Sequence, residues 1–331
     1  MSLQDLKPQH YFELQSSGIS DAIIDRYFAS IEGEAAQEWL IEDAFDTLGG
    51  HAQQYATAPV KRLLEQSEHA TMGGWICTAN GQIKPDHPRQ AIELYKGEWL
   101  PVFINNEPKL IKYESKREKP YKGAHVSLMQ PIGTPRKTAN GQRLVIVTEG
   151  AKKAAAAATL GYESIGFPGV DMGKVSGSDE LIPVLAKLAI KGATIAIAFD
   201  KDKKTETKKG VANSLLRLAT ALENAGAKVV IPTWKVKDGK GIDDVLVAQG
   251  AEFVHDAIAQ AEPLKQWRQA QPKSYFKKAR PAGYTAELKR IEALHKAYNV
   301  RPTADVTLNQ RYLDKGKLGA AGSVEIGRAH V

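Results

Sequence analysis

The chain has 331 residues, a formal net charge of +7 at pH 7 and an apolar content of 43%. This length allows two domains or one large domain with appendages, and the composition is typical of a globular protein rather than a disordered one. No apolar run approaches the roughly 20 residues that a membrane-spanning helix needs, and the first residues lack the layout of a signal peptide. The single cysteine, Cys77, excludes an intramolecular disulfide and a cysteine-rich zinc ribbon. We therefore expect a cytoplasmic protein that does not bind membranes.

Charge is distributed unevenly along the chain. Residues 1–70 carry 4 basic and 12 acidic groups, a balance of −8, and residues 71–143 carry 12 and 6, a balance of +6. Residues 144–266 are nearly neutral, with 16 basic and 15 acidic groups, whereas residues 267–331 carry 13 and 5, a balance of +8. Basic segments thus flank the central segment on both sides. A protein that holds a polyanion needs this layout, although lysine-rich surfaces often serve only solubility.

The first 143 residues are predicted to form two regions. In the acidic region 1–70, apolar residues from Leu14 to Phe28 recur at roughly helical spacing, which predicts helices. Residues 71–143 change to short strands and turns, and we interpret them as a basic α+β subdomain. Asn80-Gly81 is a strong hairpin signal. The strands expected here cover residues 73–77, 99–104 and 109–113, and residues 131–141 are expected to be a linker.

Residues 144–262 alternate strands and helices regularly. The expected strands are 144–148, 163–167, 193–199 and 228–231, and the expected helices are 150–160, 179–190 and 210–225. This alternation predicts an α/β fold with a parallel sheet, right-handed crossovers and helices on its faces. Residues 263–331 are expected to be a basic helical tail, with an amphipathic helix near 285–298.

Acidic residues follow three of these elements. Glu149 ends the first strand, Asp200 and Asp202 follow the third, and Asp243 and Asp244 follow the last. The carboxyl ends of parallel strands meet at one edge of a sheet, so these side chains can share a pocket suited to Mg²⁺ and phosphate chemistry. Taken singly, each motif has an ordinary alternative: a helix cap at Glu149, a solvated loop around Lys201, and an N-cap before residue 245.

The order of these motifs resembles the TOPRIM domain of bacterial-type primases, topoisomerases and related nucleases, in which a strand ending in Glu-Gly precedes a strand ending in Asp-x-Asp and a further acidic loop. The chain also resembles the TOPRIM-containing N-terminal regions of plasmid and phage replication proteins. Upstream, Lys112-Tyr113-Glu114-Ser115 and Tyr121-Lys122-Gly123 look like the basic segment that precedes TOPRIM in primases. Two departures are that Gly241 replaces an aspartate of the acidic loop, and that a basic insertion, residues 203–209, precedes Gly210.

The resemblance implies a primase that makes short primers on single-stranded DNA from nucleoside triphosphates, with Mg²⁺ or Mn²⁺ as the cofactor. Glu149, Asp200 and Asp202 would be catalytic, and Asp243 and Asp244 would join them as metal ligands. The residues implied in nucleotide or nucleic-acid binding are Lys112, Tyr113, Lys122, Gly150, Lys152, Lys153, Lys201 and Lys240. A replicative helicase is a possible partner, although this chain contains no P-loop motif.

Two other functions stay open. A TOPRIM nuclease would use the same metal site to cleave phosphodiesters, and a DNA-binding replication module would keep the acidic site without catalysis. Three tryptophans, Trp75, Trp99 and Trp234, are candidates for base stacking, but core packing is the commoner role. The histidines at positions 51, 69, 87 and 125 lack metal-site spacing and are expected at the surface.

Overall fold

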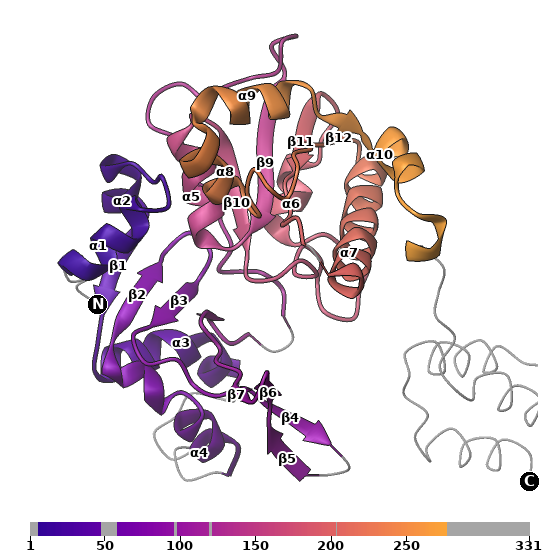
Figure 1. Cartoon of the computed structure of the whole chain (residues 1–331). Coiled ribbons are helices and arrows are strands. Elements are labelled where there is room, and N and C mark those ends of the chain that lie inside the picture. Colours follow the sequence, from indigo (N-terminus) through magenta and orange to yellow (C-terminus); the bar gives the residue numbers. More distant parts are fainter. Residues whose placement is uncertain (1–5, 48–57, 96–97, 119–120, 203, 277–331) are drawn as a thin grey trace, which may run out of the picture. The chain divides into compact units, whose positions relative to one another are not determined.

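The computed structural model describes residues 6–47, 58–95, 98–118, 121–202 and 204–276. Residues up to Tyr275 belong to one compact unit that contains an antiparallel and a mostly parallel sheet (Figure 1). The predicted helix near 285–298 lies outside the described residues. Among the described helices, none has the length and apolarity required to cross a bilayer.

The antiparallel sheet forms in the first part of the chain and has the strand order β1-β2-β3-β8. Its elements in chain order are α1 (Pro8–Gln15), α2 (Asp21–Tyr27), β1 (Phe28–Ile31), α3 (Glu34–Thr47), α4 (Ala58–Glu65), η2 (Glu68–Met72), β2 (Gly74–Cys77), β3 (Gln82–Pro85) and β8 (Glu114–Ser115). Between β3 and β8 lie two separate pairs of strands, β4 (Ile92–Tyr95) with β5 (Glu98–Pro101), and β6 (Phe103–Ile104) with β7 (Glu107–Pro108).

The hairpin predicted at Asn80-Gly81 is confirmed. It joins β2 to β3, Gly81 has a φ of 64°, and the Asn80 side chain accepts a hydrogen bond of 3.1 Å from the Gln82 N–H. β1 was not predicted, because the helical spacing of apolar residues continues through Phe28. The run Phe28–Ile31 is buried throughout and pairs with β2, so sheet packing overrides the helical pattern.

Two strand predictions in the basic region are wrong in extent. The strand expected over 99–104 is two strands, β5 and β6, and the segment 109–113 contributes only an isolated bridge at Leu110. Pro101 ends β5 and Pro108 ends β7. Proline has no N–H to donate to a ladder, which explains why these strands are short.

The predicted parallel sheet is confirmed, with the strand order β10-β9-β11-β12-β13 and only β13 antiparallel. Its elements in chain order are β9 (Arg143–Glu149), α5 (Ala151–Thr159), β10 (Glu163–Phe167), α6 (Pro183–Leu188), β11 (Ala193–Ile197), α7 (Thr205–Asn224), β12 (Lys228–Ile231), α8 (Ile242–Gln249), α9 (Ala251–Ala259), β13 (Glu262–Pro263), α10 (Leu264–Ala270) and η3 (Lys273–Tyr275).

Two helix boundaries differ from the prediction. Helix α6 begins at Pro183 rather than near residue 179, because the fixed φ of proline suits the first turn and its ring would break a helix interior. Helix α7 begins at Thr205, five residues earlier than expected. Part of the basic insertion therefore forms the first turns of α7, and Lys208 lies on a helix.

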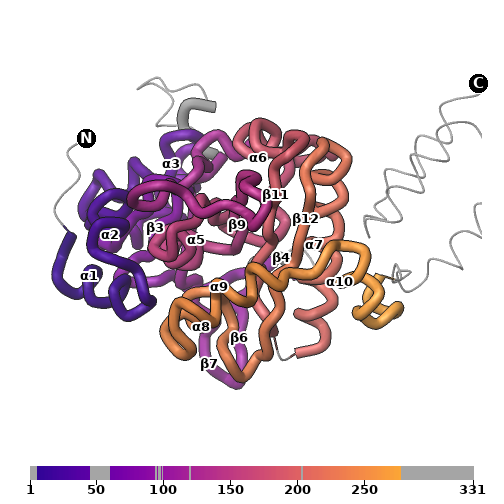
Figure 2. The backbone as a smooth tube through the Cα atoms, turned by 90° about the horizontal axis from the view of Figure 1, so that it is seen from above, coloured from indigo at the N-terminus to yellow at the C-terminus, as the bar shows by residue number. Residues whose placement is uncertain are grey.

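The strand order creates a switch point between β9 and β11. The chain steps from β9 to β10 in one direction and from β10 through β11 to β12 in the other. Right-handed crossovers then place α5 on one face of the sheet and α6 and α7 on the opposite face (Figure 2). In open α/β sheets, ligands bind outside the carboxyl ends of the strands at such a point.

Helix α5 is buried on two sides, which accounts for its run of alanines. One side packs on the parallel sheet, where Ala157 and Leu160 join a core with Leu144 and Ile146. The other side packs on the first part of the chain. The residues of that second core are Leu14, Ile19, Ile23, Ile24, Phe28, Trp75, Cys77, Ala79 and Met129, with Ala151, Ala154, Ala155 and Ala158 of α5. Only small side chains let one helix lie this close to both layers.

A pair of glycine substitutions tests this close packing. A Cβ at Gly166 of β10 would lie 2.5 Å from the Gly150 carbonyl oxygen and 3.0 Å from the Ala154 Cβ, whereas a Cβ at Gly210 of α7 would meet nothing within 4 Å. We expect Gly166→Ala to lower the free energy of unfolding by about 1–3 kcal/mol through overpacking. The control Gly210→Ala is expected to raise it by up to about 1 kcal/mol, since alanine is the better helix former. Urea denaturation measures both, and equal stabilities for the two variants would contradict the packing of α5 against β10.

Candidate functional site

The carboxyl ends of β9 and β11 bring Glu149 and Asp200 together at the switch point. Beyond the last residue of β11, pairing with β9 continues at Ala198, whose N–H donates to the Val147 carbonyl (2.8 Å). The Ala198 carbonyl also accepts a hydrogen bond of 2.9 Å from the Thr148 hydroxyl. This continued pairing delivers Asp200 to the edge where Glu149 ends β9. Burial raises the pKa of the Glu149 carboxyl, and the charge of Asp200 raises it further.

The two aspartates of Asp200-Lys201-Asp202 lie with the carboxylate cluster, and the lysine between them points elsewhere. The Lys201 Nζ donates to the Pro232 carbonyl at 3.3 Å and lies 5.2 Å from the Trp234 ring centroid. Burial lowers the pKa of Lys201. Successive residues of extended backbone point in opposite directions and alternate residues in the same direction, so Asp200 and Asp202 can share one side while Lys201 points to the other. The Lys201 amine, which the sequence predicts to bind nucleic acid, thus points away from the Lys240 ammonium that pairs with both aspartates.

Two lysines occupy the spaces between the carboxylates. The Lys240 Nζ lies 3.3 Å from the Asp200 Oδ2 and 3.7 Å from the Asp202 Oδ2, and the Lys153 Nζ lies 3.4 Å from the Asp200 Oδ1. The backbone N–H of Lys201 donates to the Lys240 carbonyl at 2.9 Å, which ties the two loops together. Opposite charges at these distances offset much of the repulsion among the acidic groups.

Lys153 is the central cation of the cluster. Burial alone would lower its pKa, but the carboxylates of Asp200, Asp243 and Glu149 together raise it above the ordinary value of lysine. The side chain passes over Gly241, where a Cβ would lie 2.3 Å from the Lys153 Cε and 2.6 Å from the Asp243 Oδ1. A side chain at position 241, where the TOPRIM resemblance implies an aspartate, would require Lys153 and Asp243 to shift.

The two aspartates of the last loop have different surroundings. Asp243 is 7% exposed, and burial raises the pKa of its carboxyl while Lys153 opposes the rise. Asp244 is exposed, and its Oδ2 accepts a hydrogen bond of 3.1 Å from the Gly241 N–H, which closes the first turn of α8. This geometry matches the ordinary capping alternative for Asp244, and its assignment as a metal ligand stays a prediction.

The donor set of the cluster suits a hard cation. The Oδ1 atoms of Asp200 and Asp243 are buried and have no hydrogen-bond partner of ordinary geometry, and a bound ion is one of the recognised reasons for such an atom. Within the described part of the chain, no three histidine, cysteine or acidic side chains stand close enough to enclose a metal ion. Mg²⁺ is usually held by one or two carboxylates plus waters and substrate phosphates, so the cluster fits Mg²⁺ rather than a metal with a complete protein cage.

Three of the residues predicted to bind nucleotide or nucleic acid lie in the segment that precedes the parallel sheet. Lys112 and Lys122 are exposed, and Tyr113 lies beside the cluster, with its ring 5.9 Å from Trp75. Burial raises the pKa of Tyr113 to about 12, and the charge of Glu13 raises it further. The charges of Lys153 and Asp243 have smaller effects, of which the first lowers this pKa and the second raises it. The sequence segment Lys112-Tyr113 is thus next to the acidic motifs in space as well as upstream of them.

Gly150 and Lys152 contact side chains of the first part of the chain. Gly150 has a φ of 86° at the start of α5, and the following N–H, of Ala151, donates to the Gln82 Oε1 at 2.7 Å. The Lys152 Nζ lies 3.5 Å from the Glu13 Oε1. Gln82 and Glu13 were not singled out from the sequence, because nothing in a lone glutamine or glutamate marks a contact with a helix about 70 or 140 residues away.

Two of the histidine expectations are wrong. The His125 side chain is 6% exposed, and the His69 Nε2 bonds to the buried Glu114 at 2.5 Å, so neither lies free at the surface. His87 is exposed as expected, and His51 lies outside the described residues. Trp75 is fully buried in the core, as its commoner role predicts, and the side chain of Trp99 lies outside the described part of the structure.

Comparisons with known proteins place part of the chain in context. Residues 138–253, which hold the acidic cluster, match a family model described as a domain of unknown function, DUF3854. An uncharacterized protein of Picosynechococcus sp. is 28% identical over 347 residues, which cover 92% of this chain and 30% of that protein. This chain therefore spans less than a third of that relative. The crystal structure of the RNA polymerase domain of Mycobacterium tuberculosis primase DnaG is similar with a TM-score of 0.38 and 15% identity, over 92% of this chain and 89% of that one.

The raised pKa of Glu149 gives a pH-dependent prediction. The pKa of Glu149 in the folded protein lies above the ordinary value of 4.5. The charged carboxylate therefore lowers the free energy of unfolding at neutral pH, and this loss disappears below pH 4.5, where the group is neutral in both states. We expect Glu149→Gln to raise the urea midpoint at pH 7 in metal-free buffer, and the gain to vanish as the pH falls toward 4.5. The control is Glu223→Gln, at an exposed position on α7, and it is expected to leave the urea midpoint unchanged at pH 7 and at pH 4.5. A variant less stable than the wild type at pH 7 would contradict the raised pKa.

Proposed function

We propose that this chain is a DNA primase-type nucleotidyltransferase that makes short primers on single-stranded DNA, in replication of plasmid or phage type. The observation that carries the proposal is the cluster of Glu149, Asp200, Asp202 and Asp243 at the switch point of a parallel sheet, with Tyr113 beside it. The sheet follows the α/β pattern with ligand-binding strand ends. The likeness of the motifs to the TOPRIM domain supports the assignment of these residues to phosphoryl transfer.

In this proposal one or two of the carboxylates of Asp200, Asp202 and Asp243 hold Mg²⁺, with waters and substrate phosphates as its other ligands, and Glu149 takes a proton. The metal would neutralise charge on the reacting phosphate and orient the attacking and leaving oxygens. Lys240 has a half-exposed side chain and is placed to turn from Asp200 toward a substrate phosphate. Mn²⁺ would replace Mg²⁺ with the same ligands.

The template and nucleotides would approach from the side of the basic residues. Lys112 and Lys122 are exposed, and Lys153 reaches the cluster from the first turn of α5. Lysines at such positions attract a polyanion and contact its phosphates. A replicative helicase, on a separate chain or in a longer version of this one, would be the natural partner of a primase.

Two alternatives share the same residues. A TOPRIM nuclease would use the same carboxylates and metal, and the position of Tyr113 beside the cluster favours the primase. A non-catalytic DNA-binding module is favoured by one observation, which is that Lys153 and Lys240 already pair with the carboxylates.

Primer synthesis tests the proposal directly. The full chain is incubated with single-stranded DNA, labelled nucleoside triphosphates and Mg²⁺, beside the variant Asp200→Asn/Asp202→Asn and the control Glu223→Gln. We expect short products from the wild type and the control, and at least about 100-fold less from the double variant, since a catalytic metal contributes several kcal/mol. Shortened template without primers would establish the nuclease. A wild type as inert as the variant, with DNA binding retained, would establish the binding module.

Metal binding is tested separately by stability. A cation that binds only the folded protein adds about 2.7 kcal/mol at 100 times its dissociation constant, and about 1.4 kcal/mol for each further tenfold concentration. We expect the melting temperature to rise with Mg²⁺ at constant ionic strength, and the rise to be lost in Asp200→Asn/Asp202→Asn. An equal response in the wild type and the double variant would place the bound cation elsewhere.

A further inference from the structure

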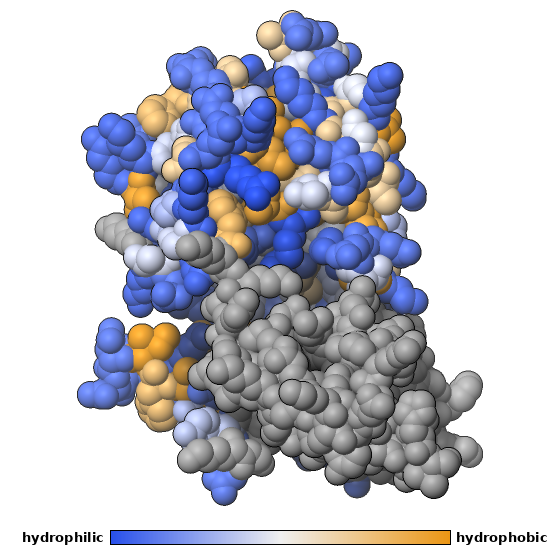
Figure 3. All heavy atoms as spheres, turned by 90° about the vertical axis from the view of Figure 1, so that its right-hand side faces the viewer, coloured by the Kyte–Doolittle hydropathy of each residue, from blue (hydrophilic) through white to orange (hydrophobic). Residues whose placement is uncertain are grey.

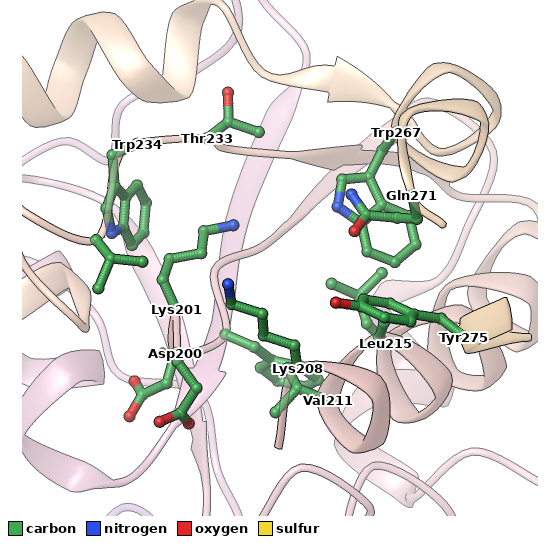
Figure 4. A pocket seen from close by; sticks show the side chains of 14 residues that line it. Asp200, Lys201, Lys208, Val211, Leu215, Thr233, Trp234, Trp267, Gln271 and Tyr275 are labelled. Carbon is green, nitrogen blue, oxygen red and sulfur yellow. The ribbon is translucent and has the colours of Figure 1, made fainter. Parts of the chain in front are cut away.

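A cavity of about 350 Å³ opens beside the carboxylates of Asp200 and Asp202. It lies between the segments that follow β11 and β12, the first half of α7, and α10 with η3 (Figure 4). The face of the molecule that carries α7 and α10 shows hydrophobic residues exposed among hydrophilic ones in Figure 3. A cavity of this size holds one small organic ligand.

Aromatic rings form two walls of the cavity. Trp234 lies on one side, and Trp267 and Tyr275 lie on the other with Gln271 beside them (Figure 4). Flat rings offer faces on which a planar heterocycle stacks, and a side-chain amide both donates and accepts hydrogen bonds at the edge of such a ring. These walls therefore suit a nucleobase better than an aliphatic ligand.

Two lysines face the space between these walls. Lys201 and Lys208 point their amines into the cavity (Figure 4). Lys201 reaches Pro232 and Trp234, but an ammonium has three donors and keeps capacity for a further acceptor. Lys208 is exposed, and none of the carboxylates in the described ranges forms an ion pair with it. Two amines that face this space can bind the phosphate oxygens of an anionic ligand.

The cavity is continuous with the acidic cluster. Asp200 and Asp202 line its floor and are the same carboxylates that pair with Lys240. A ligand with a planar base at one end and phosphates at the other would place its base near Trp267 and its phosphates near Lys208. The phosphates would then reach the cation that Asp200 and Asp202 are proposed to hold.

We infer that this cavity binds a free nucleoside phosphate, with the base among Trp234, Trp267, Gln271 and Tyr275 and the phosphates on Lys201 and Lys208. The inference deepens the proposed function. It rests on that function only where it treats the bound nucleotide as a substrate. It adds a base-binding pocket beside α7 and α10. Binding itself requires neither DNA nor catalysis.

The test is ATP binding by the full chain, measured by calorimetry and by quenching of tryptophan fluorescence, with EDTA and with Mg²⁺. Lys208→Met removes an exposed cation, and Lys209→Met is the matched control, because residue 209 lies on the same helix outside the cavity. We expect Lys208→Met to weaken ATP binding about tenfold, as the loss of a charge-assisted contact does. Tyr275→Leu is expected to weaken binding of ATP but not of inorganic triphosphate, since only the base stacks. The control is expected to bind like the wild type.

The outcomes separate this inference from the proposed function. If Lys208→Met and Tyr275→Leu lose ATP binding while the wild type makes no primers, the pocket stands and the primase does not. If the wild type makes primers and both variants keep its KM for nucleoside triphosphates, the pocket is overturned and the primase stands. A wild type that binds only oligonucleotides and no ATP also overturns the pocket. Asp200→Asn/Asp202→Asn is expected to keep ATP binding in EDTA.

Discussion

The double burial of α5 is the constraint on which the rest of the structure depends. An ordinary surface helix buries one stripe, but the alanines of α5 contact the parallel sheet on one side and the core of the first region on the other. Gly166 of β10 allows the same close approach at the start of the helix. The Gln82 amide then caps α5 from the antiparallel sheet, so the two sheets are held together around the helix. Because α5 also carries Lys152 and Lys153, its packing fixes where these cations lie relative to the carboxylates.

The position of the acidic cluster follows from topology and its properties follow from burial. Strand order alone brings the ends of β9 and β11 to one crevice, and continued pairing at Ala198 sets Asp200 against Glu149. Carboxylates that crowd together away from water favour their neutral forms, which is why the pKa of Glu149 is raised. The lysines reduce this cost without filling every acceptor, since the Oδ1 atoms of Asp200 and Asp243 keep no hydrogen bond of ordinary geometry.

Features that follow from a periodic apolar pattern, or from the residues at the ends of strands, could be predicted from the sequence. Alternating apolar strands and helices predicted the parallel sheet, and strand ends predicted which carboxylates meet. The sequence was uninformative where a contact joins segments far apart in the chain, as for Gln82 with α5, or where burial overrides local spacing, as in β1. The cavity was missed for the same reason. Trp267 and Tyr275 lie in a basic stretch without periodicity, and only the packing of α10 and η3 against α7 brings them near Lys208.

The glycine at position 241 determines where the central lysine of the cluster lies. With glycine there, Lys153 extends across the loop and lies among Asp200, Asp243 and Glu149. Counted as charges, the carboxylates of Glu149, Asp200, Asp202 and Asp243 face the ammonium groups of Lys153 and Lys240, which leaves two negative charges. That is the charge of one divalent cation. An aspartate at position 241 would add a negative charge and would occupy the space that the Lys153 side chain crosses. The glycine and the lysine together therefore leave the cluster with a net charge that the single Mg²⁺ of the proposed function would balance.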